Sequence, residues 1–143
     1  MEDEDQDLGR RTCKRFEIPG STVSFTITKS PSSKNKYEEE FCPILDISRG
    51  GLKFSGSKPV EINSDVTLKI SIPGETIPLT FNGKVQWLSA IEEQDKYQIG
   101  VQFNPYGEKE GQNYPGNLVK IIALEQKFLT RDKVETEKYE IDG

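Results

Sequence analysis

The chain has 143 residues, enough for one domain with a single hydrophobic core and too few for two ordinary domains. Apolar residues make up 33% and charged residues 30% of the sequence, and the longest purely apolar run, 121–124, is far too short to span a membrane. The net charge of −5 argues against general affinity for nucleic acid, and the acidic first residues are unlike a signal peptide, so we expect a cytoplasmic protein with no membrane insertion.

The N-terminal part of the chain divides into a tail, a basic cluster and a first strand. Residues 1–9 are acidic with almost nothing to bury, so this segment is expected to be disordered. A basic cluster occupies residues 10–15. From residue 22, Val23, Phe25 and Ile27 alternate with hydroxyl-bearing side chains, which is typical of a half-buried strand.

Five further strands follow in chain order. Residues 31–37 are predicted to form a polar turn, and residues 41–48 and 51–55 the second and third strands. Residues 65–72 alternate cleanly and end at a Pro-Gly turn. The next strand is predicted over 77–87, with Gly83 marking a bend or bulge, and the last over 97–103. Short strands without an intervening helical period indicate an all-β antiparallel sandwich or barrel.

The C-terminal part has a helical pattern instead. Asn117 is a plausible N-cap, and the apolar residues after it recur at helical spacing up to Leu129. This helix is expected to pack against the strands or to close one end of the structure. Residues 10–130 are therefore predicted to form one domain, and residues 131–143 a charged tail to which no secondary structure is assigned.

The side chains that commonly hold metals or catalyse reactions are scarce. The sequence has no histidine, and its two cysteines, Cys13 and Cys42, form no metal-ligand cluster. Glu38, Glu39 and Glu40 are adjacent rather than convergent, which favours a solvated turn. We therefore expect no metal, no cofactor and no enzymatic activity, and both thiols are expected to stay reduced.

The basic cluster is the most informative charge feature. Three of the five arginines are Arg10, Arg11 and Arg15, and Lys14 completes four positive charges within six residues of an acidic chain. Such a cluster favours a small anionic ligand over a polynucleotide. Arg11 and Arg15 form an Arg-x-x-x-Arg motif before the first predicted strand, and residues 46–51 form an Asp-x-Ser-x-x-Gly motif between two strands.

Together with the phrase Ile-Gly-Val-Gln-Phe at 99–103 and the C-terminal helix, these motifs resemble the PilZ family over residues 10–129. The resemblance implies an all-β fold, a six-stranded antiparallel PilZ-type β-barrel (split barrel or Greek key) with a C-terminal α-helix. It also implies a receptor for cyclic di-GMP that changes the conformation of its arginine loop on binding. The signal would pass to a protein partner in motility, pilus or polysaccharide machinery, or in virulence control.

The motif residues suit that ligand chemically. The guanidinium forks of Arg11 and Arg15 match phosphate oxygens and the O6/N7 edge of guanine. The Asp46 carboxylate can accept hydrogen bonds from guanine N1–H and its amino group. The Ser48 hydroxyl can donate to a phosphate, and Gly51 lets the backbone turn and the ligand approach.

Four further residues have two readings each. Arg10 extends the first motif, where the resemblance implies an influence on how many ligands bind, or it is a solvated charge. Lys14 and Arg49 are phosphate contacts or solvated charges. Trp87 stacks on a guanine or packs in the barrel wall. The alternative function is a PilZ-like protein-interaction module that binds no nucleotide.

Overall fold

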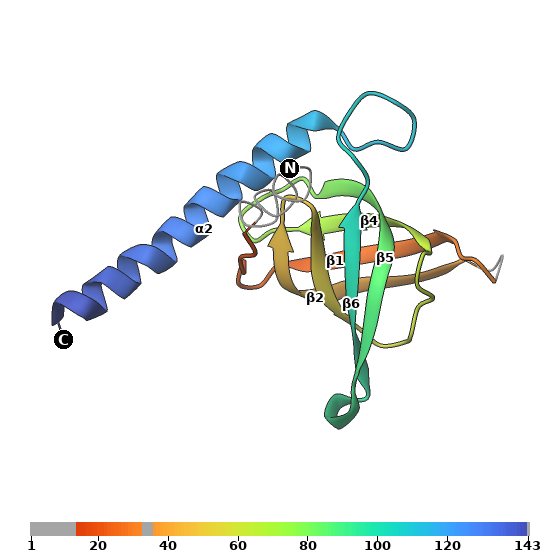
Figure 1. Ribbon diagram of the computed structural model, residues 1–143, viewed down its shortest axis with the longest axis horizontal. Coiled ribbons are helices and arrows are strands. Elements are labelled where there is room, and N and C mark those ends of the chain that lie inside the picture. The colour runs from red at the N-terminus through yellow and green to blue at the C-terminus, as the bar shows by residue number, and fades with distance from the viewer. Residues whose placement is uncertain (1–13, 33–35, 143) are drawn as a thin grey trace, which may run out of the picture.

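A computed structural model describes residues 14–32 and 36–142, with side chains as far as Leu129. In the described residues, six strands close into an antiparallel barrel in the order β1-β2-β3-β6-β5-β4 (Figure 1). The strands are β1 (Thr22–Lys29), β2 (Tyr37–Ser48), β3 (Gly51–Gly56), β4 (Asp65–Ser71), β5 (Leu79–Ile91) and β6 (Lys96–Phe103). A 3-10 turn, η1 (Glu92–Gln94), lies between β5 and β6, and one long helix, α2 (Pro115–Asp142), ends the described chain. This architecture confirms the predicted fold class.

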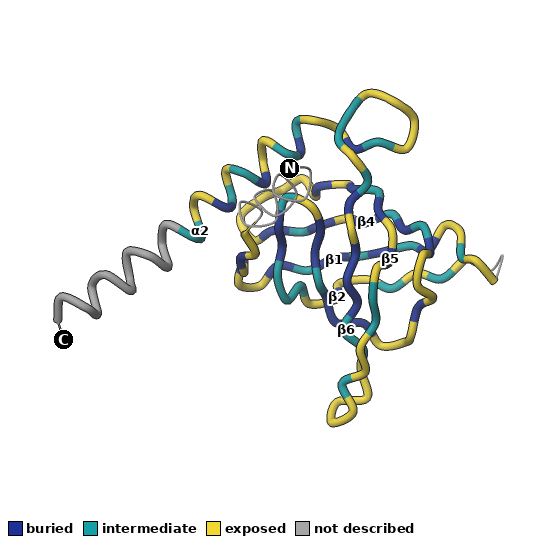
Figure 2. The backbone as a smooth tube through the Cα atoms, viewed as in Figure 1, coloured by how far each residue is buried: buried dark blue, intermediate teal, exposed yellow. Residues whose placement is uncertain are grey.

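The alternation of apolar and polar side chains explains the barrel. On β1, Val23, Phe25 and Ile27 are buried while the residues between them are partly exposed, because successive strand residues point to opposite faces. The inward-facing residues of all strands fill the barrel, which is dark blue along its strands in Figure 2. Phe81 and Phe103 stack at the centre with ring centroids 4.2 Å apart. Within the described part of the chain, no helix combines the length and apolarity needed to cross a bilayer.

Strand β2 starts earlier than predicted, and strand β5 runs from Leu79 to Ile91 where 77–87 was predicted, so both of its ends differ. Strand β2 begins at Tyr37, so the acidic run 38–40 is strand and not turn: Glu39 pairs with Phe25 and Tyr37 with Ile27 of β1. Strand β5 begins at Leu79, and Ile77, which was assigned to it, is 74% exposed outside the strand. In both places the neighbouring strand decides the limits, because a strand continues only while it has a hydrogen-bonding partner.

The predicted bend at Gly83 is wrong. Gly83 pairs regularly with Val66 of β4 and Phe103 of β6, and the register of β5 shifts later, between Val85 and Trp87. A Cβ on Gly83 would meet the carbonyl oxygen of Gln102. The glycine therefore permits close approach of β6, a role that a sequence cannot distinguish from a bend.

Helix α2 begins earlier and ends later than predicted. Its first residue is Pro115, a residue favoured at the first helical position, so Asn117 lies inside the helix and is not its N-cap. The Asn117 side-chain amide instead donates to the Thr80 carbonyl at 2.9 Å. At the other end the helix continues through residues 131–142, where no structure was predicted, because lysine and glutamate are good helix formers.

The helix packs against one end of the barrel. Asn117, Ile121 and Glu125 are buried at four-residue spacing, so they lie on one face of α2. Ile121 is 0% exposed, whereas Val119, on a different face, is 66% exposed. The helix therefore caps the barrel as the apolar spacing predicted.

Replacing Ile121 tests this packing. Ile121→Ala should lower the free energy of unfolding by about 2–5 kcal/mol, because it leaves a cavity between helix and barrel. The matched exposed change, Val119→Ala, should alter it by no more than about 0.5 kcal/mol. Urea denaturation of both variants measures the difference, and equal effects would show that the helix is not docked.

A polar cluster at the other end of the barrel joins β2 to the segment after β3. Glu39 accepts hydrogen bonds from the Ser57 amide at 3.1 Å and from the Tyr37 hydroxyl at 3.0 Å. Partial burial raises the pKa of Glu39, but these hydrogen bonds outweigh it and hold the pKa below its ordinary value.

Burial, followed by the nearby Glu39 charge, raises the pKa of the free Cys42 thiol to about 12, so this thiol is protonated and unreactive at neutral pH. Cys13 lies outside the described residues.

The lowered pKa of Glu39 makes its contribution to stability depend on pH. The contribution is complete above the ordinary value of 4.5 and is lost as the pH falls through the lower folded pKa. Glu39→Gln should therefore destabilise the protein by about 1–2 kcal/mol at pH 7, and this difference should shrink below pH 4.5. Chemical denaturation across pH measures it. The exposed neighbour variant Glu38→Gln is the matched control and should change the free energy of unfolding at pH 7 by no more than about 0.5 kcal/mol.

Candidate functional site

The segment before β1 pairs with β2 through backbone hydrogen bonds. Phe16 and Ile47 form an antiparallel bridge, exchanging two backbone hydrogen bonds of 2.9 Å each. Phe16 and Ile18 are only 3% and 4% exposed, so their burial anchors the segment. This pairing places Arg15 beside Asp46, and so brings the described end of the first motif onto the second.

Arg15, Asp46 and Lys53 form a line of charges at this junction. An Arg15 guanidinium nitrogen lies 2.7 Å from Oδ1 of Asp46, and the Lys53 ammonium lies 3.3 Å from Oδ2. Arg15 is 55% exposed and Asp46 15% exposed, so the aspartate is recessed while the guanidinium reaches solvent. An ion pair of this kind contributes about 0–1 kcal/mol to the free energy that orients the arginine.

The turn between β2 and β3 is closed by its own serine. The Ser48 hydroxyl accepts from the Gly50 amide at 3.2 Å and donates to the Gly51 carbonyl at 3.4 Å. Gly51 lies so close to β6 that a Cβ would overlap the Val101 carbonyl oxygen. The packing of β3 against β6 therefore requires a glycine at residue 51. The roles predicted for it, letting the backbone turn and the ligand approach, are separate from this packing.

Trp87 reaches the outer surface through an irregularity in β5. Phe81 and Val85 point into the barrel, so regular alternation along β5 would also point Trp87 inward. The register of β5 with β6 shifts between Val85 and Trp87, and this shift breaks the alternation. The indole is half-buried and lies over Gly100 of β6, where any Cβ would overlap it. The missing side chain at residue 100 is therefore what allows the tryptophan to lie flat against the barrel.

These parts surround an open cavity of about 460 Å³ on the outside of the barrel. Four of the predicted site residues line it: Arg15, Ser48, Gly51 and Trp87; the other lining residues are Gly50, Leu52, Gln86, Gly100, Val101 and Gln102. The cavity thus offers a cation, an aromatic face and amide side chains. Among the described residues, no group of three or more acidic or cysteine side chains is placed to hold a metal ion.

The other predicted residues have different locations. Asp46 does not line the cavity, but its carboxylate pairs with Arg15, which does. Lys14 is exposed and does not line the cavity. The Arg49 guanidinium pairs with Glu125 of α2, at 2.9 Å. Arg10 and Arg11 lie outside the described residues.

The sequence prediction did not include Lys53, Gln86 and Gln102. All three are polar residues on strands that flank the motif turn: Lys53 is on β3, Gln86 on β5 and Gln102 on β6. Their outward direction follows from the alternation with buried neighbours such as Phe54, Val85 and Val101. What the alternation does not reveal is that β3, β5 and β6 lie side by side.

The fit between Trp87 and Gly100 can be tested with the chain's single tryptophan as the reporter. Gly100→Ala should displace the indole, shift its fluorescence emission to longer wavelength and increase quenching by acrylamide, because the ring becomes more exposed. Gly50→Ala is the matched control, since a Cβ there meets no atom within 4 Å. Unchanged emission in Gly100→Ala would contradict the described packing.

Known proteins match this chain at the level of fold and family. One similar solved structure is that of the K. pneumonia MrkH–c-di-GMP complex, with a TM-score of 0.54 and 18% sequence identity. The match covers 91% of this chain and 55% of that one, so the chain spans about half the length of MrkH. No curated protein sequence matches the chain. The PilZ domain model matches residues 9–116, which include both motifs and all six described strands, and the chain therefore belongs to the PilZ domain family.

Proposed function

We propose that this protein is a receptor that binds cyclic di-GMP in the cavity beside the motif turn. The observation that carries the proposal is the position of Arg15: its guanidinium is held 2.7 Å from Asp46, at a cavity that Trp87 also lines. The membership of the PilZ domain family and the likeness to MrkH, a structure of which contains c-di-GMP, support it.

The cavity chemistry fits a cyclic dinucleotide of guanine. Arg15 can form paired hydrogen bonds with a phosphate or with the O6/N7 edge of guanine. The exposed face of Trp87 offers a surface for base stacking, which is worth about 1–3 kcal/mol per base. Arg10 and Arg11 would add positive charge for the two phosphates, and Ser48 a hydroxyl. No cofactor and no catalytic step is part of the proposal.

Ligand binding would exchange one set of ion pairs for another. In the free protein, the Asp46 carboxylate forms ion pairs with both Arg15 and Lys53. A ligand phosphate can replace Asp46 as the ion-pair partner of Arg15. The Asp46 carboxylate can then accept hydrogen bonds from guanine. Because the exposed Arg15–Asp46 pair is worth only about 0–1 kcal/mol, the exchange costs little.

The proposed signal is a change in the arginine-bearing segment. Ligand would neutralise the like charges of this segment and fix it against the motif turn, which changes the surface offered to another molecule. The protein partner would belong to motility, pilus or polysaccharide machinery, or to virulence control. The site would act in the cytoplasm, where the nucleotide is made.

Calorimetric titration with cyclic di-GMP tests the receptor role. Arg15→Ala should weaken binding about tenfold or more, because each arginine–guanine contact is worth about 1–3 kcal/mol. Arg15→Lys should bind with intermediate affinity, since it keeps the charge but loses the planar fork. Lys69→Ala removes an exposed cation on β4, away from the cavity, and should bind as the unaltered protein does.

Cyclic di-AMP is the ligand control in the same titration. It carries the same phosphates without the guanine edge, so we expect it to bind more weakly than cyclic di-GMP. Failure of the unaltered protein to bind cyclic di-GMP would leave the fold and family unchanged and would favour a nucleotide-independent interaction module.

A further inference from the structure

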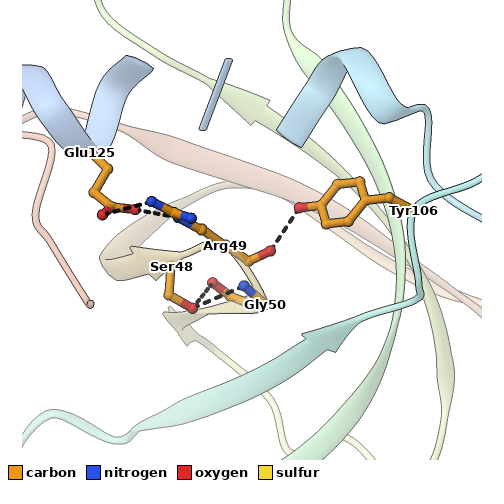
Figure 3. Close-up of polar contacts among 6 residues, drawn as sticks. Ser48, Arg49, Gly50, Tyr106 and Glu125 are labelled. Atoms are coloured by element: carbon orange, nitrogen blue, oxygen red, sulfur yellow. Dashed lines mark hydrogen bonds and ion pairs between the residues drawn. The ribbon is translucent and has the colours of Figure 1, made fainter. Parts of the chain in front are cut away.

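The motif turn is held from outside the barrel sheet by residues that follow the last strand. The Tyr106 hydroxyl donates to the Arg49 carbonyl at 2.7 Å. The Arg49 guanidinium donates to both carboxylate oxygens of Glu125, at 2.9 and 3.3 Å (Figure 3). The main chain and the side chain of one turn residue are therefore both fixed by the C-terminal part of the protein.

This ion pair is more protected than the pair at the cavity. The Glu125 side chain is 10% exposed and that of Arg49 36%, whereas Arg15 is 55% exposed. Removing one charge from a pair in which the other is nearly buried leaves that charge uncompensated, which is far more disruptive than loss of a surface pair. The guanidinium of Arg49 also contacts the helix and does not line the cavity.

The same residues fix the helix. Glu125 shares one face of α2 with Asn117 and Ile121, which attach the preceding turns of the helix to the barrel. On the other side of the ion pair, Arg49 immediately follows Ser48, whose hydroxyl bonds to Gly50 and Gly51 at the cavity. The Arg49 side chain thus connects Glu125 of the helix to the turn that lines the cavity.

We propose that Glu125 is a positioning residue for the ligand site, and that docking of helix α2 and ligand binding stabilise each other through the Arg49–Glu125 pair. This inference rests on the proposed function. The helix holds the turn in the conformation that lines the cavity, so ligand binds better when the helix is docked. By thermodynamic reciprocity, the ligand then holds the helix in place. A partner that contacts α2 would thereby sense whether the cavity is occupied.

The main rival role for Arg49 is a direct phosphate contact. That role predicts the opposite change in ligand affinity when Glu125 is replaced. If Arg49 served the ligand, Glu125 would compete for it, and Glu125→Gln would remove this competing carboxylate and tighten binding. If Glu125 positions the turn, Glu125→Gln should weaken binding by about tenfold, within the usual range of coupling between sites. The exposed Glu110→Gln, between β6 and the helix, removes the same charge without this contact and is the matched control.

Two further variants separate positioning from general loss of stability. Tyr106→Phe removes only the hydroxyl that holds the Arg49 carbonyl, and it should also weaken binding while the fold is retained. The exchanged pair, Arg49→Glu with Glu125→Arg, should recover most of the affinity that Glu125→Gln loses. Weak binding by Glu125→Gln with normal binding by Tyr106→Phe and no recovery by the exchanged pair would overturn the proposal.

Two measurements complete the experiment. Without ligand, the amide NMR signals of Gly50 and Gly51 should shift in Glu125→Gln and stay in place in Glu110→Gln. With cyclic di-GMP, hydrogen exchange of residues 117–125 should slow in the unaltered protein and much less in Glu125→Gln. Unshifted glycine signals, or affinity that is unchanged or tighter in Glu125→Gln, would overturn the proposal. If the unaltered protein binds no cyclic di-GMP, the proposed receptor function fails, and the glycine signals alone decide whether Glu125 positions the turn.

Discussion

The bridge between Phe16 and Ile47 is the contact on which the candidate site depends. It consists of two backbone hydrogen bonds, and the buried side chains of Phe16 and Ile18 fix it to the barrel. Arg15 and Asp46 are 31 residues apart in the sequence, and their exposed ion pair is too weak to bring them together. Apolar burial does this instead, so the hydrophobic anchor determines where the charge lies and the charge remains available to a ligand.

The inner face of the barrel wall forms the hydrophobic core, and the outer face carries the candidate site. The inner face is packed with apolar side chains, and closure of the sheet gives each described strand a hydrogen-bonded neighbour on both sides. The outer face of β3, β5 and β6 presents the cavity, so Gln86, Trp87 and Gln102 stand on strands, while Arg15 and Gly50 line it from the segments beside them. The register shift before Trp87 and the absent side chain at Gly100 adapt this outer face, because together they turn the indole outward and make room for it.

The helix links this outer site to the rest of the molecule. Its apolar contact through Ile121 keeps it on the barrel, and the nearly buried carboxylate of Glu125 pairs with Arg49 of the motif turn. The chain has only five arginines, and the two that the structure describes at the barrel, Arg15 and Arg49, are each paired with an acidic side chain. The first pair lies at the cavity, and the second joins the motif turn to the helix.

The sequence alone determined the six strands, the helix and the two motifs, because period-two burial on β1 and β4 and the helical spacing around Ile121 are local patterns. Tertiary structure decided the start of β2, since its acidic residues become strand only by pairing with β1. It also decided the direction of Trp87, because alternation predicts a face only while the register is regular. The partner of Arg49 lies 76 residues away, and such a pairing arises only when the helix docks on the barrel. Local periodicity specifies elements, whereas the site is assembled from contacts between elements distant in sequence.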